Sequence, residues 1–244
     1  ETIEKIISLA KERGAFEIYD SKREEVMTVR VDRIDPENGN VMVETPNGNA
    51  TLLATEMIPG EQFKVGDHVK VFVSEVKREM KGPIVTFSRT HPNFVKRLFE
   101  LEVPEISDGV VEIKSVAREP GMRSKISVYT QDENIDPVGA CVGHKGMRVQ
   151  TIVNELRGEK IDIVKYSEDP AQYVANALSP AKVVSTEVNL EEKICRVVVP
   201  DYQLSLAIGK EGQNARLAAK LTGWKIDIKS ESQAAEEEYA EGEE

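Results

Sequence analysis

The chain has 244 residues, of which 40% are hydrophobic and 31% charged, a composition typical of one to three globular domains. No stretch approaches the ~18 consecutive apolar residues of a membrane-spanning helix, and the N-terminal segment lacks the apolar run of a secretion signal, which excludes a spanning or exported protein. The net charge of −11 argues against a nucleic-acid partner, but seven of the 43 acidic residues lie in the last fourteen, which contain no Lys or Arg. Residues 1–230 therefore carry a net charge of only −4, and any polyanion site would have to be local.

A helix is predicted over residues 1–13, because apolar residues recur there at helical spacing until Gly14. Since residue 1 is Glu rather than Met, we expect residues 1–24 to be the last helix and linker of an N-terminal domain that is missing. The two cysteines, Cys141 and Cys195, form no C-x-x-C pair, which predicts a reducing, cytoplasmic location.

Residues 25–90 change to short runs in which apolar and polar residues alternate, separated by turns rich in Pro, Gly, Asn and Asp. Five strands are predicted in this segment. A single sheet of this size must close or be covered, and the usual small solution is a five-stranded OB-type β-barrel.

Two segments then follow the same order of elements, residues 91–168 and residues 169–230. Each is predicted to contain a helix, two strands, a short helix, a G-x-x-G loop, a longer helix and a last strand. The loops Gly143-His144-Lys145-Gly146 and Gly209-Lys210-Glu211-Gly212 are 66 residues apart, and the spacing indicates an internal duplication. The Glu-rich residues 231–244 show no apolar period and are predicted to be a disordered acidic tail.

A glycine loop between two helices suits an anionic ligand. The missing Cβ atoms allow close approach of a sugar-phosphate chain, and the next helix presents its N–H groups and positive dipole end. His144, Lys145 and Lys210 suit such a ligand, whereas Glu211 does not. The alternative is a plain helix-turn-helix connection with glycine caps, which a duplicated context disfavours. The order of elements predicts an α+β multidomain chain, with a barrel followed by two tandem KH (αββααβ) domains that bind single strands.

No catalytic constellation is found in the sequence. Cys141 and His144 could be a nucleophile and base or two metal ligands, but no further Cys or His cluster completes either site. Asp162 and Asp227 recur in equivalent strands, each as a lone acid that we expect on a solvent face. The sequence therefore predicts no enzyme activity, no metal and no cofactor.

Four longer runs resemble the NusA family of bacterial transcription elongation and termination factors: Phe87-Ser88-Arg89-Thr90-His91-Pro92, Ala117-Arg118-Glu119-Pro120-Gly121-Met122-Arg123-Ser124-Lys125, Asp136-Pro137-Val138-Gly139-Ala140-Cys141-Val142-Gly143 and Gln203-Leu204-Ser205-Leu206-Ala207-Ile208-Gly209. The resemblance implies an S-one-type barrel, two KH domains and binding of single-stranded RNA. It also implies association with RNA polymerase and other transcription factors to modulate pausing, termination and antitermination. The family's polymerase-binding N-terminal domain would precede the barrel, and we expect a monomer.

Carried over position by position, the family's RNA contacts fall on the two loops and the helices after them: Gly143, His144, Lys145, Gly146, Arg148, Gly209, Lys210, Glu211, Gly212, Gln213, Asn214 and Arg216. Glu211 stands where the family more often has a small or basic residue, which predicts a weaker second loop. Two other interpretations remain open. One is an accessory module of an RNA-processing enzyme, although that family places a single KH domain before its barrel. The other is a scaffold that binds protein.

Overall fold

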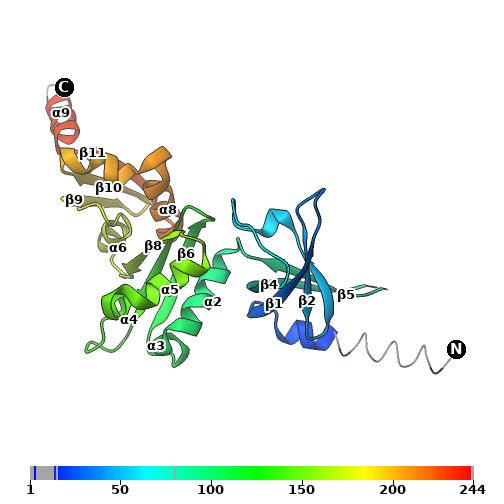
Figure 1. Cartoon of the computed structure of the whole chain (residues 1–244). Coiled ribbons are helices and arrows are strands. Elements are labelled where there is room, and N and C mark those ends of the chain that lie inside the picture. Colours follow the sequence, from blue (N-terminus) through cyan, green and yellow to red (C-terminus); the bar gives the residue numbers. More distant parts are fainter. Residues whose placement is uncertain (1–2, 4–13, 15, 80, 243–244) are drawn as a thin grey trace. The chain divides into compact units, whose positions relative to one another are not determined.

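The computed structural model describes residues 3, 14, 16–79 and 81–242. Apart from Ile3, the predicted helix over residues 1–13 lies outside the described residues. The chain divides into two compact units, one ending at Leu98 and the other beginning at Phe99 (Figure 1).

The first unit is built around a five-stranded antiparallel sheet. The strands are β1 (Val26–Ile34), β2 (Val41–Thr45), β3 (Gly48–Leu52), β4 (His68–Glu79) and β5 (Gly82–Ser88). Their order in the sheet is β3-β2-β1-β4-β5, and the two outer strands approach each other although no ladder joins them in the described residues. The predicted five-stranded barrel is therefore confirmed, in a nearly closed form. Alternate side chains fill its interior, including Val31, Val43, Leu52, Val71, Val73 and Phe87.

The chain after the barrel contains two copies of one arrangement, as the sequence predicts. The first copy consists of α2 (Pro92–Glu102), α3 (Pro104–Ser107), β6 (Glu112–Glu119), β7 (Arg123–Tyr129), α4 (Pro137–Val142), α5 (Met147–Glu155) and β8 (Lys160–Lys165). The second consists of α6 (Pro170–Ala177), β9 (Ser185–Asn189), β10 (Ile194–Val199), the 3-10 turn η3 (Asp201–Gln203), α7 (Leu204–Ile208), α8 (Gln213–Thr222) and β11 (Lys225–Ser230). In each three-stranded sheet the middle strand is antiparallel to the first strand and parallel to the last.

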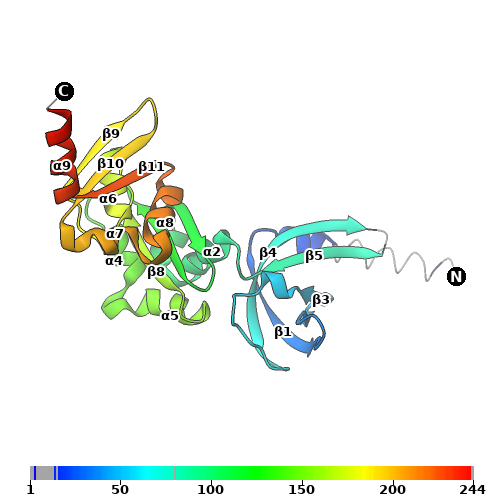
Figure 2. The same ribbon diagram turned by 90° about the horizontal axis from the view of Figure 1, so that it is seen from above.

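The two copies share one interior. Helices α6 and α8 of the second copy pack on the sheet of the first, so residues 124–128 of β7 are all buried. The Tyr173 hydroxyl lies 2.8 Å from Ser127 Oγ, and Ala117 and Val164 belong to the same apolar cluster as Leu217. The second copy therefore covers the sheet face that the first copy's own helices leave open (Figure 2).

The predicted disordered tail is wrong for the described part of that segment. Residues Glu231–Glu241 form helix α9, which begins with a capping box: Ser230 Oγ accepts the Gln233 N–H at 3.2 Å, and Gln233 Oε1 accepts the Ser230 N–H at 3.1 Å. Asp201 Oδ1 accepts the Ser232 N–H at 3.0 Å, and Glu237 forms an ion pair with Lys229. The prediction from composition took no account of the capping box or of the contacts with Asp201 and Lys229. These interactions offset the conformational entropy that the helix loses on ordering.

Candidate nucleic-acid interface

The two G-x-x-G loops have the same backbone. The first glycine has φ/ψ of 78°/173° in one loop and 80°/170° in the other, the third residue 52°/27° and 56°/26°, and the last glycine 73°/15° and 74°/12°. The third residues are Lys145 and Glu211, which both take the left-handed conformation that few non-glycine residues adopt. The agreement within a few degrees means that one loop geometry is built twice.

The first glycine of each loop is needed for packing as well as for its positive φ. A Cβ at Gly143 would lie 2.6 Å from Arg148 Cγ, and a Cβ at Gly209 would lie 2.7 Å from the Asn214 main-chain N. No such contact limits Gly146, where the left-handed φ of 73° is the requirement. The loop shape therefore depends on close approach between each first glycine and the helix that follows.

The tips of both loops face solvent. His144 and Lys145 are exposed in the first loop, as are Lys210 and Glu211 in the second. These are the positions that the sequence predicts to point outward. The first loop thus carries a cation and a titratable imidazole, whereas the charges of Lys210 and Glu211 cancel. Both loops lead into the N-terminus of a helix, α5 or α8, whose free N–H groups favour an anion.

The residues two positions after each loop are turned inward. Arg148 Nη1 donates to the Ala140 carbonyl at 2.7 Å and to Glu105 Oε2 at 2.9 Å. Asn214 is only 3% exposed, and its Nδ2 donates to the carbonyls of Leu178 and Ala207. The burial of Asn214 contradicts a direct RNA contact by its side chain. Both residues hold the loop helix against the preceding helix, and Arg148, whose side chain is 32% exposed, stays a predicted RNA contact.

Arg216 links the second loop to the first KH domain. Its Nε donates to Glu119 Oε1 at 3.0 Å and its Nη1 to the Glu211 carbonyl at 3.0 Å. The guanidinium remains 44% exposed, so it stays available at the surface while it fixes the loop. Gln213, also carried over by resemblance, is half-buried next to it.

A charged cluster beneath the second KH domain was missed in the sequence. Lys125 is fully buried, and its Nζ donates to Asp162 Oδ2 at 2.9 Å and to the Ser179 carbonyl at 2.7 Å. Burial lowers the pKa of Lys125, and the charge of Asp162 opposes that shift. The expectation of a lone Asp162 on a solvent face is therefore wrong, because Arg123 also pairs with it at 3.3 Å. Asp227 is exposed as expected.

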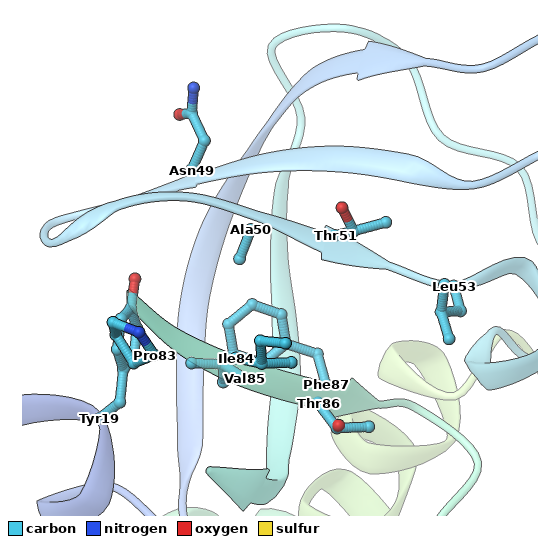
Figure 3. Close-up of a pocket in the computed structure, with 10 residues that line it drawn as sticks. All are labelled: Tyr19, Asn49, Ala50, Thr51, Leu53, Pro83, Ile84, Val85, Thr86 and Phe87. Atoms are coloured by element: carbon cyan, nitrogen blue, oxygen red, sulfur yellow. The ribbon is translucent and has the colours of Figure 1, made fainter. Parts of the chain in front are cut away.

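The barrel has a cavity of about 290 Å³ between its unjoined strands β3 and β5. Figure 3 shows its lining, in which Ala50 and Phe87 lie between the two strands. None of the ten lining residues is charged. The cavity therefore lacks the Lys and Arg side chains that neutralise phosphate charge.

The described residues contain no group of three or more His, Cys, Asp or Glu side chains that could hold a metal ion. Cys141 is buried, and burial raises the pKa of its thiol to about 12, so it is not poised as a nucleophile for the exposed His144. Within the part of the chain that the structure describes, no helix has both the length and the apolar character needed to cross a membrane.

A five-stranded barrel followed by two αββααβ units, each with a glycine loop between its paired helices, defines a tandem-KH protein with an OB-type barrel. Residues 89–166 match the model of the NusA-like first KH domain, and residues 170–236 match that of the NusA-like second KH domain. The chain belongs to the NusA family.

Curated relatives agree with this assignment. The chain is 61% identical over 226 residues to the transcription termination/antitermination protein NusA of Halalkalibacterium halodurans, covering 92% of this chain and 59% of the relative. Identity to the protein of the same name from Bacillus subtilis is 59%, covering 92% and 60%. For Thermus thermophilus it is 46%, covering 93% and 60%. The chain thus spans about three fifths of the length of these relatives.

Proposed function

We propose that this chain binds single-stranded RNA across its two G-x-x-G loops and is the RNA-reading part of a transcription termination and antitermination factor. The observation that carries the proposal is the repeated loop backbone in two domains that share one interior. Loops 143–146 and 209–212 agree within a few degrees, and Lys125, Tyr173 and Arg216 tie the two domains together. The loops therefore present two sites with the same backbone geometry at a fixed separation.

The chemistry at each loop is that of phosphate recognition. A loop of this type clamps about four nucleotides of backbone. His144, Lys145 and Lys210 supply positive or titratable groups, and the N-termini of α5 and α8 supply N–H donors. The function is binding, with no bond made or broken, and needs no cofactor.

The setting follows from the family. The curated relatives are named transcription termination/antitermination proteins, which supports RNA polymerase, nascent RNA and other transcription factors as partners. We place the activity in the cytoplasm, with RNA sites in residues 91–168 and 169–230. The cavity in the barrel of residues 25–90 has no Lys or Arg in its lining, and we assign it no RNA site.

Charge reversal in the loops tests the proposal. One variant carries His144→Asp and Lys145→Asp, and the other carries Lys210→Asp and Glu211→Asp. Asp tolerates the left-handed conformation of the third position, so both variants should fold. The first variant changes the loop charge by about −3, because a Lys is lost and two Asp are gained, and the second by about −2, because Glu211 is already acidic. Negative charge placed before a helix N-terminus competes with a phosphate for that position. Lys64→Asp, an exposed barrel position, is a control matched in charge to the second variant.

Affinity for a single-stranded oligoribonucleotide is measured over a range of salt concentrations. With about four phosphate contacts, log K against log salt has a slope near −3 in the parent. We expect weaker binding and a flatter slope in both loop variants, most strongly in the first, and no change for Lys64→Asp. Parent-like affinity and slope in both well-folded loop variants would show that the loops are ordinary turns and would overturn the proposal.

A further inference from the structure

The helix that leads into the second loop carries an exposed aromatic ring. Tyr202 in η3 is 79% exposed, and Leu206 in α7 is 43% exposed. Tyr202 and Leu206 thus form an exposed apolar face on the segment that leads into the second loop. The opposite face is buried, because Ala207 is fully enclosed and Leu204 packs against the apolar cluster. The fold therefore fixes this apolar face outward.

The residues on both sides of Tyr202 form hydrogen bonds to other elements. Asp201, directly before it, accepts the Ser232 N–H at 3.0 Å, and the Gln203 side chain, directly after it, accepts the Lys182 N–H at 3.0 Å. The backbone on both sides of Tyr202 is thus anchored to other elements of the second KH domain. Because this backbone is already ordered, the segment loses less conformational entropy when Tyr202 binds a partner.

Among the described residues, the corresponding segment of the first KH domain, residues 135–142, has no exposed aromatic ring. Sixty-six residues before Tyr202 stands Asp136, whose side chain accepts the Val138 N–H as a helix cap, and Leu206 corresponds to Ala140. The loops differ in the opposite sense, because the first carries a basic pair and the second carries Lys210 beside Glu211. The tip of the first loop thus carries more positive charge than the tip of the second, whereas Tyr202 and Leu206 place exposed apolar surface beside the second loop.

We propose that Tyr202 stacks on an unpaired base of the RNA strand whose phosphates lie on loop 209–212, so that the second KH domain holds RNA chiefly through a base and the first chiefly through charge. The inference rests on the proposed function and adds a contact to the same site. Tyr202 is separated from Gly209 only by Gln203 and the five-residue helix α7, which keeps the ring close to the four nucleotides that such a loop takes. An uncharged ring next to a loop of zero net charge suits a base, since every base has a π face.

Two substitutions and a matched control test the stacking. Tyr202→Ala removes the ring, and Tyr202→Phe keeps the ring while removing the hydroxyl. Tyr239→Ala is the control, because Tyr239 in α9 is equally exposed at 80% and lies outside the proposed site. The probe is a mixed-sequence single-stranded oligoribonucleotide that carries 2-aminopurine at successive positions. Affinity, salt slope and quenching of the fluorescent base are measured on the full chain.

We expect Tyr202→Ala to weaken binding about 5- to 100-fold, to abolish quenching at one position of the probe, and to leave the salt slope unchanged. Tyr202→Phe and Tyr239→Ala should bind like the parent. Parent-like affinity for Tyr202→Ala would overturn the inference, as would a loss in Tyr202→Phe or Tyr239→Ala equal to that in Tyr202→Ala. If the parent itself fails to bind the probe, the proposed function fails first, which separates the two results.

Discussion

The ammonium group of Lys125 in the first KH domain donates a hydrogen bond of 2.7 Å to the main-chain carbonyl of Ser179 in the second. The same group pairs with Asp162 of its own domain. Lys125 thus joins two strands of its own sheet and also binds the domain that covers that sheet.

Replacing Lys125 with Met should cost about 1–2 kcal/mol of unfolding free energy. The variant leaves the Ser179 carbonyl without its donor, but Asp162 keeps Arg123 as a partner. The cost is moderated because burial already lowers the pKa of Lys125, so the charged form is held against a desolvation penalty. Chemical denaturation measures the change, with Lys160→Met, an exposed lysine on the neighbouring strand, as the control. A loss equal to that of the control would contradict this role.

The buried thiol of Cys141 should resist alkylation in the folded chain at pH 8, because burial raises its pKa from 9.0 to about 12 and the charge of Glu105 adds to the shift. The folded pKa is above the unfolded one, so the contribution of this thiol to stability is complete below pH 9 and is lost between pH 9 and about 12. Iodoacetamide labelling with and without denaturant, read by mass spectrometry of the Cys141 peptide, checks the first point. Denaturation of a Cys141→Ala variant across this alkaline range checks the second. Rapid labelling without denaturant would contradict the expected protection.

Helix α9 should lose about 1 kcal/mol of stability when Ser230 is replaced by Ala, because the capping box supplies the Gln233 N–H with its acceptor. The loss should be local. Amide hydrogen exchange should speed up at residues 231–241 and remain unchanged in β7. Ser185→Ala, at an exposed serine in β9, is the control. Unchanged exchange in α9 would mean that Asp201 and Lys229 anchor the helix without the cap.

The positions of the two loops could be predicted from the sequence because the duplication repeats glycines at a constant offset, and glycine at positive φ is a local requirement. The inward orientation of Asn214 could also have been found. Asn214, Leu217, Ala218 and Leu221 are all buried along one face of α8 and follow the spacing of a core stripe. The resemblance to the family instead placed Asn214 among the RNA contacts.

Lys125 shows what local patterns could not predict. In the sequence it is an ordinary lysine in an alternating strand. Its burial follows from the packing of α6 and α8 on β7, and its partner Asp162 lies opposite it only in the parallel register of β7 with β8. Both relationships join residues far apart in the chain, and no local periodicity records them.

Helix α9 follows the last strand of the second copy, β11, as α6 follows the last strand of the first copy, β8. Helix α6 buries Tyr173, Val174 and Ala177 on the sheet before it, whereas α9 has no buried residue among those described. The order of helix α9 therefore depends on its cap and its polar anchors, Asp201 and Lys229, rather than on burial of an apolar face.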